Sequence, residues 1–215
     1  MKKEVIKSSL GILLIIIFFI LSSYLIKNNI YNINSYFNYG FIGVIIYLII
    51  IILSIVVAPI SAIPFIPVAS NLWGWRTTAL LSILGWTIGA MIAFTLARKY
   101  GIDLVKNLID LKKIQKLEKL IPEENIFLTI VLLRMVTPVD GVSYFFGLFS
   151  KVPFKKFTLA TIIGITPFSF IIAYLGTVPI SYQILVFSIM FIVLFSGLVT
   201  AYYIKKRKNK IMNII

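Results

Sequence analysis

Two charged residues stand out because they lie inside long apolar segments. Asp140 is the only acidic residue within such a segment, and Arg134 is the only basic residue well inside one. A charge at bilayer depth is costly and usually faces a partner or a water pathway. Arg134 is suited to hold a phosphate and Asp140 to carry a proton, whereas the alternative is a structural ion pair that pins the chain. We favour the functional interpretation, because a turn is a poor place to bury charge merely for stability.

The residues around this pair predict a reversal of the chain. On an unbroken helix, an offset of six residues would place the two side chains about 240° apart. Pro138 interrupts helical hydrogen bonding and can bring them together. Small and hydroxyl-bearing residues follow, which allow close backbone approach and supply polar contacts: Gly141, Ser143, Tyr144 and Gly147. Tyr144 could instead be an interfacial anchor and Gly147 a simple turn.

The composition restricts the chemistry. The chain has 215 residues, is 60% hydrophobic, and contains neither Cys nor His. These absences exclude disulfides, thiol nucleophiles, imidazole bases and the usual zinc sites, so we expect no enzyme, no metal and no other cofactor. The net charge of +14 comes from basic residues that flank apolar runs. We therefore expect membrane lipids as partners and not nucleic acid.

Six segments are long and apolar enough to enter a bilayer, at about residues 10–26, 40–57, 77–97, 125–147, 157–175 and 182–204. Their patterns favour helices and not barrel strands, which predicts an all-α polytopic membrane protein. The first segment has basic residues before it but no small-x-small cleavage site after it. It is interpreted as a retained signal anchor.

The distribution of basic residues requires two extra reversals. If every segment crossed the membrane, the seven basic residues from Arg98 to Lys119 would lie opposite the N-terminus, the 151–156 loop and the tail. Re-entrant hairpins at about 40–74 and 125–149 place 18 of the 21 basic residues in the cytoplasm. This predicts cytoplasmic N- and C-termini in a multi-pass protein, with a prokaryotic plasma membrane as the expected location because no sorting signal is present. Broken backbone at membrane depth also implies a cavity.

The first hairpin is predicted from its prolines and one amide. Its tip is assigned to Pro59, Pro64, Pro67 and Asn71. Asn71 and the neighbouring Ser70 could hydrogen-bond across to the second hairpin or cap the next helix.

A short internal similarity predicts an inverted repeat. Residues 82–87 resemble residues 161–166, and each copy follows a hairpin broken by proline. The two helices run in opposite directions in the proposed topology, as in inverted-repeat transporters. Gly85 and Gly89, spaced by four, indicate close helix packing.

The stretch from Arg134 to Leu148 resembles the DedA superfamily, in the branch of SNARE-associated Golgi or VTT-domain proteins. Gly85 and Gly89 followed by Phe94 and Arg98 match that family's aromatic-x-x-x-basic element on the inner face. The resemblance covers about residues 40–180. It implies two re-entrant hairpins that meet in the membrane, and movement of lipid between leaflets. The family's acidic residue in the first hairpin is missing here, so Asp140 would act alone.

These observations divide the chain into three parts: a signal-anchor helix and outer loop at 1–39, a DedA/VTT-like membrane domain at 40–180, and a last transmembrane helix with a basic cytoplasmic tail at 181–215. The leading hypothesis is a lipid transporter or scramblase that moves an anionic phospholipid or polyprenyl-phosphate headgroup between leaflets, with or without proton coupling. The alternatives are a proton-coupled carrier of a small cation or metabolite, and a non-transporting membrane assembly factor. The sequence leaves a homo-oligomer open.

Overall fold

The chain is almost entirely helical where its structure is described. The computed structural model describes residues 2–36, 40–57, 61–108, 125–136, 140–150, 152–190 and 192, and these contain no strand. The elements in chain order are α1 (Lys2–Tyr36), α2 (Gly40–Val56), the short 3₁₀ helix η1 (Ile63–Phe65), α3 (Ile66–Trp73), α4 (Trp75–Leu108), α6 (Ile126–Val136), α7 (Asp140–Phe149) and α8 (Phe154–Thr177). A further helix runs from Ile180 to Met190. The predicted all-α class is confirmed.

Three of the described helices are long and apolar enough to cross a membrane. They are Leu10–Asn28 within α1, Trp75–Gly101 within α4, and Phe154–Thr177. Many large apolar side chains on these helices are exposed, which suits contact with lipid tails. Three of the predicted segments are therefore helices of sufficient length and apolar character to span a bilayer. The predicted segment 125–147 is not one span, because it is divided into α6 and α7, and the end of the predicted segment 182–204 lies outside the described residues.

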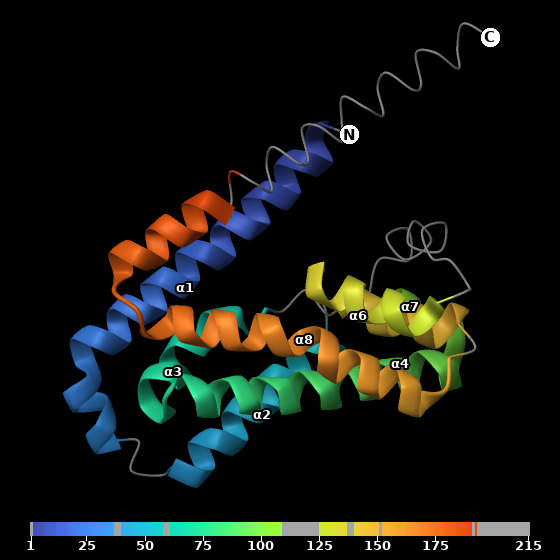
Figure 1. Cartoon of the computed structure of the whole chain (residues 1–215), viewed down its shortest axis with the longest axis horizontal. Coiled ribbons are helices and arrows are strands. Elements are labelled where there is room, and N and C mark those ends of the chain that lie inside the picture. Colours follow the sequence, from blue (N-terminus) through green and yellow to red (C-terminus); the bar gives the residue numbers. More distant parts are fainter. Residues whose placement is uncertain are drawn as a thin grey trace, which may run out of the picture.

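The centre of the fold is an antiparallel pair formed by α4 and α8 (Figure 1). In the second half of α4, before its kink at Gly101, Phe94 stacks on Phe157 near the start of α8, with ring centroids 4.2 Å apart. At the other end of the pair, Trp75 of α4 meets Tyr174 of α8 edge to face, with ring centroids 5.6 Å apart. Glycine with a positive φ of 80° at Gly74 turns the chain from α3 into α4.

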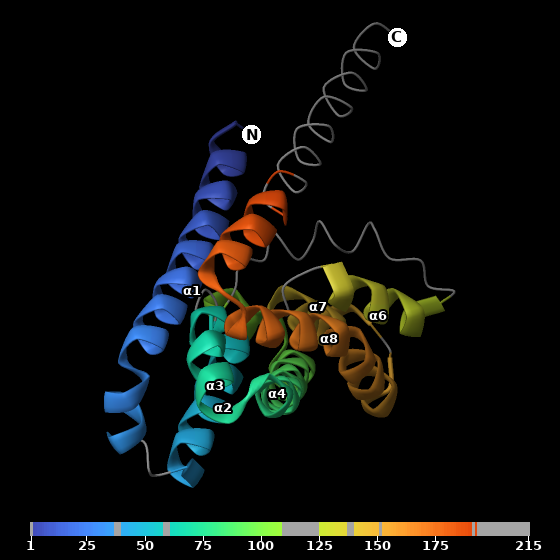
Figure 2. The same cartoon turned by 60° about the vertical axis from the view of Figure 1, so that its left-hand side comes forward.

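Each predicted hairpin has two helical arms, α2 and α3 in the first hairpin and α6 and α7 in the second. In each hairpin one arm packs on α4 and the other on α8. The first arms pack within their own half of the chain, α2 against α4 and α6 against α8. The second arms pack across the halves, α3 against α8 and α7 against α4. Figure 2 shows α2 and α3 beside α4, with α6 and α7 at the other end of α8. The two halves are therefore interlocked and not placed side by side as separate units.

Glycines permit the close approach of the first arms. A Cβ added to Gly85 would lie 2.6 Å from Cγ2 of Ile51 on α2, and one added to Gly164 would lie 2.8 Å from the carbonyl oxygen of Val131 on α6. Gly89 packs in the same way against α2. The predicted packing role of the Gly85 and Gly89 pair is confirmed.

The second arms use equivalent positions as well. In the register that aligns Gly85 with Gly164, Ala97 aligns with Gly176. A Cβ on Gly147 of α7 would lie 2.6 Å from that of Ala97, and a Cβ on Gly176 would lie 2.9 Å from Cα of Pro67 on α3. Matching contacts from both arms on two antiparallel helices support the predicted inverted repeat.

Outside this core, α1 and the helix Ile180–Met190 lie side by side (Figures 1 and 2). Phe19 of α1 meets Phe187 of the later helix edge to face, with ring centroids 5.0 Å apart. The chain leaves α8 at Val178 and Pro179, where proline cannot continue the helix, and turns back along α1.

Candidate functional site

Arg134 lies in the interior of the helical assembly. Its side chain is only 2% exposed, although a guanidinium stays charged under all ordinary conditions. Nη2 donates a hydrogen bond to Oγ of Ser143 on α7, at 2.8 Å. The guanidinium carbon also lies 5.5 Å from the ring centroid of Phe157 on α8, within the range of a cation–π contact. Three helices thus surround one buried cation.

Close packing between α6 and α8 fixes the stem of this arginine. A Cβ on Gly164 would lie 2.5 Å from Cβ of Arg134, so any side chain at position 164 would push α6 away. The same glycine that supports the inverted repeat therefore also positions the candidate site. In these apolar surroundings the interactions of the guanidinium are stronger than they would be in water.

Tyr144 connects the two hairpins. Its side chain is fully buried, and its hydroxyl donates to the carbonyl oxygen of Val56 at 2.7 Å. Val56 is the last residue of α2, where carbonyl groups have no partner within the helix. Tyr144 is consequently not an interfacial anchor but a contact between α7 and the end of the first hairpin's leading arm.

The remaining residues of the second hairpin lie along or before α7. Gly147 lies within the helix and packs on the backbone of α4, 2.5 Å from the carbonyl oxygen of Phe94 if a Cβ is added, so its interpretation as a turn is wrong. Asp140 and Gly141 begin α7, but their side-chain surroundings lie outside what the structure describes, as does Pro138. The structure brings Arg134, Ser143 and Tyr144 to one region.

The residues assigned to the first hairpin's tip are spread along its return. Pro64 lies in η1, and Pro67 opens α3 and packs on Gly176. Asn71 donates to the carbonyl oxygens of Pro67, at 2.7 Å, and of Gly176, at 3.0 Å. The expected bond from Asn71 to the second hairpin is therefore replaced by one to the end of α8. Pro59 lies outside the described residues.

Arg98 has a connecting role at the other end of α4. Its Nη1 donates to the carbonyl oxygen of Val152 at 2.9 Å, and its Nη2 donates to that of Ser150 at 2.6 Å. The guanidinium also covers the ring of Phe94, 4.3 Å from its centroid. The basic element of the predicted motif thus ties the connection between α7 and α8 to α4.

Several polar contacts were not predicted from the sequence. Tyr47 of α2 and Ser82 of α4 share a buried hydrogen bond of 2.7 Å. A second group joins α1 to the end of α8 through Ser23, Lys27 and Gln183. The available signal was the same as for Arg134, namely polar side chains inside or at the end of apolar segments. Among the residues that the structure describes, no group of three or more metal-ligating His, Cys, Asp or Glu side chains occurs.

Comparison with known families agrees with this arrangement. The VTT domain model matches residues 61–178, which include α3, α4, α6, α7 and α8. No curated protein and no solved structure matches the chain significantly. The matched region contains the crossing helices, the whole second hairpin and Arg134, and it spans more than half of the sequence. The chain belongs to the VTT-domain family, that of the DedA and SNARE-associated Golgi proteins, and it is a membrane protein.

Proposed function

We propose that the protein moves lipids with an anionic headgroup between the two leaflets of its membrane. The observation that carries this proposal is the burial of Arg134 between α6, α7 and α8, inside the region that matches the VTT domain. A guanidinium offers five N–H donors in a geometry that suits phosphate. The substrate is a phospholipid or a polyprenyl phosphate, since both carry the same phosphate chemistry.

The packing suggests how a headgroup reaches this cation. Ser143 on α7 already accepts a hydrogen bond from Arg134, so a phosphate reaches the guanidinium when α7 moves away from α6. The bond from Tyr144 to Val56 holds α7 against the first hairpin and opposes that movement. Exposed apolar side chains on α4 and α8 keep the lipid tails in the bilayer while the headgroup passes.

The membrane setting of this activity completes the proposal. The protein is a multi-pass transporter of a prokaryotic plasma membrane, with both termini in the cytoplasm, and it is not an enzyme. Its partners are membrane lipids. Asp140, at the start of α7, is the carboxyl group that would couple transport to protons.

Reconstitution into sealed vesicles tests the proposal. The vesicles contain fluorescent phosphatidylglycerol or a labelled polyprenyl phosphate, and a membrane-impermeant quencher reports the lipid that reaches the outer leaflet. We expect the wild-type protein to move at least one of these lipids. Arg134→Gln should slow movement about 10- to 100-fold, the loss of one charge-assisted hydrogen bond. The proposal fails if the wild-type protein moves neither lipid.

Two control variants separate the loss of the site from the loss of the fold. Arg76→Gln removes an exposed arginine that lies over Trp75 at the start of α4, and it should leave the rate unchanged. Arg134→Lys keeps the charge without the planar fork, and its rate should fall between those of wild type and Arg134→Gln. If the Arg134 variants unfold at the same temperature as wild type and still transport at the wild-type rate, Arg134 is not the headgroup contact.

A further inference from the structure

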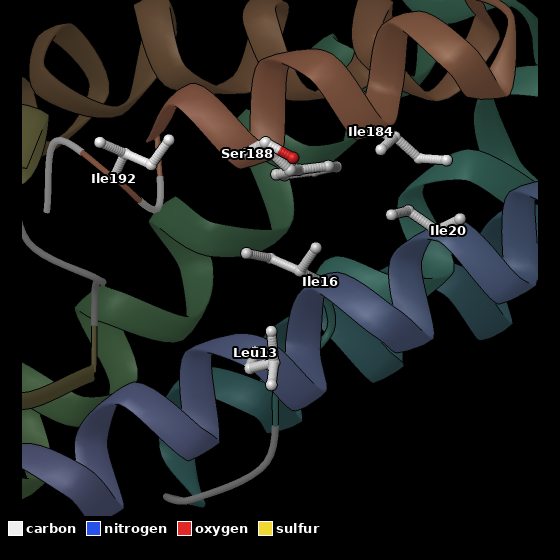
Figure 3. A pocket seen from close by; sticks show the side chains of 7 residues that line it. Leu13, Ile16, Ile20, Ile184, Ser188 and Ile192 are labelled. Carbon is white, nitrogen blue, oxygen red and sulfur yellow. The ribbon is translucent and has the colours of Figure 1, made fainter. Parts of the chain in front are cut away.

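A cleft lies between α1 and the helix Ile180–Met190, outside the region that matches the VTT domain. Its volume is about 220 Å³. Six of the seven side chains that line it are aliphatic or aromatic, and the seventh is a serine: Leu13, Ile16, Ile20, Ile184, Phe187, Ser188 and Ile192 (Figure 3). Both helices also expose large apolar side chains, as suits surfaces that face lipid tails.

Polar side chains that do not line the cleft follow it along the two helices. Beyond Ile20 and Ile184, Nε2 of Gln183 donates to Oγ of Ser23 at 2.7 Å and to the carbonyl oxygen of Val178 at 2.9 Å. One turn further along α1, Nζ of Lys27 donates to the same Val178 carbonyl. The Lys27 side chain is partly exposed, and an ammonium has three donors. Among the described residues, the ammonium donates one hydrogen bond, to the Val178 carbonyl, so a cation follows an apolar cleft along the same two helices.

We propose that this cleft binds one acyl chain of an anionic membrane lipid, with the lipid phosphate at Lys27. The apolar lining favours the acyl chain of the lipid, and the Lys27 ammonium favours its negatively charged phosphate. A second copy of the protein does not offer the same match, because no acidic residue occurs between Glu4 and Asp103. Glu4 lies at the end of α1 opposite to Lys27, so a second pair of these helices brings no carboxylate to it.

The bound lipid would also support the first hairpin. Ser22 of α1 donates to the carbonyl oxygen of Pro64 at 2.6 Å, and Ser23 donates to that of Gly176 at 3.4 Å. The helix pair that holds the lipid is thus joined to η1 and to the end of α8. This site is separate from Arg134, and its occupancy does not depend on whether the protein transports lipid.

Protection of an introduced cysteine tests the proposal, since the chain has no cysteine of its own. Ser188→Cys lies in the cleft, and Leu185→Cys lies on the same helix, 55% exposed and outside the cleft. The full-length variants in detergent are alkylated with N-ethylmaleimide as phosphatidylglycerol or phosphatidylcholine is added. At a lipid concentration about ten times the dissociation constant, phosphatidylglycerol should slow alkylation of Ser188→Cys about tenfold. Phosphatidylcholine should slow it much less, and Leu185→Cys should respond to neither lipid.

Lys27→Gln in the Ser188→Cys background supplies the second measurement. It should abolish the difference between the protection by phosphatidylglycerol and by phosphatidylcholine. The weaker protection that depends only on the acyl chain should remain. The proposal is overturned if both lipids protect Ser188→Cys equally, or if neither does. It is also overturned if protection rises with protein concentration and not with lipid, because a second copy then fills the cleft. A lipid-binding result here combined with no transport in vesicles would leave this site standing and remove only the proposed function.

Discussion

The two halves of the membrane domain share their packing but differ in their polar chemistry. Gly85 of α4 faces Ile51, whereas its counterpart Gly164 of α8 faces Arg134. Ser82 bonds to Tyr47, whereas its counterpart Thr161 is buried and has no hydrogen-bond partner among the described residues. The architecture is therefore repeated and the charge is not, which places the candidate headgroup site in one half only.

Adding a charge to the other half should have the largest effect. Ile51 is fully buried against Gly85, as Arg134 is against Gly164. Ile51→Arg therefore places a guanidinium in apolar packing, without the Ser143 and Phe157 contacts that Arg134 makes. We expect a loss of about 3 kcal/mol in the free energy of unfolding, the cost of an arginine at the centre of a membrane helix. Unfolding by dodecyl sulfate in mixed micelles measures it. Ile51→Val is the control, with a loss of about 1 kcal/mol, and equal effects would show that the two halves tolerate charge alike.

Adding a methyl group at the crossing glycines should destabilise both halves by similar amounts. Gly85→Ala and Gly164→Ala each force a Cβ into an atom closer than 3 Å, and overpacking of this kind costs about 1–3 kcal/mol. Gly11→Ala is the matched control, since no described residue lies within 4 Å of its added Cβ. The same unfolding measurement applies. Equivalent packing is contradicted if one of the two crossing variants is as stable as Gly11→Ala.

The two buried tyrosine hydroxyls should differ more modestly. Tyr144→Phe leaves the Val56 carbonyl without its partner at the end of α2, and we expect a loss of about 1 kcal/mol. Tyr47→Phe should cost less, about 0.6 kcal/mol, because Ser82 still donates to the carbonyl oxygen of Thr78. In the vesicle assay, Tyr144→Phe should also accelerate lipid movement, and Tyr47→Phe should not. The reverse order would remove Tyr144 as the link that restrains α7.

The smallest effect should come from the hydroxyl of Thr161. Thr161→Val keeps the shape of the side chain and removes a buried hydroxyl without a partner among the described residues, so stability should stay within about 0.5 kcal/mol of wild type or rise. Ser82→Ala removes a bonded hydroxyl at the aligned position and should be the more destabilising of the two. A large loss for Thr161→Val would reveal a polar contact in the second half and weaken the contrast between the halves.

Much of this fold followed from charge and proline. The basic loops required two reversals, and the structure divides the segment around Pro138 into α6 and α7. Gly85 and Gly89 were recognisable because a glycine pair spaced by four in an apolar helix has few roles except close packing. The exchange of second arms could not be foreseen, since α4 and α8 are apolar on most sides and their patterns do not distinguish one neighbour from another.

The candidate site was predictable only where a charged or polar side chain stands out in an apolar segment of the sequence. Arg134 was evident because a buried charge is rare, and Ser143 followed from its place in the same hairpin. The hydrogen-bond partner of Tyr144 could not be predicted, because it is the backbone carbonyl oxygen of Val56, and every residue has such an oxygen. The contact of Lys27 was not predictable for the same reason, because its acceptor is the backbone carbonyl oxygen of Val178.

The exchange of arms between halves determines when the protein can finish folding during its synthesis. The ribosome completes α3 about 100 residues before the end of α8, against which α3 packs. At ordinary translation rates, the first half waits about 5–20 s for its partner. During that interval the face of α4 that receives α7 is also uncovered. A nascent chain arrested after α4 therefore exposes the surfaces of α3 and α4 that α7 and α8 later cover, and it is the form that insertion factors and membrane proteases would encounter.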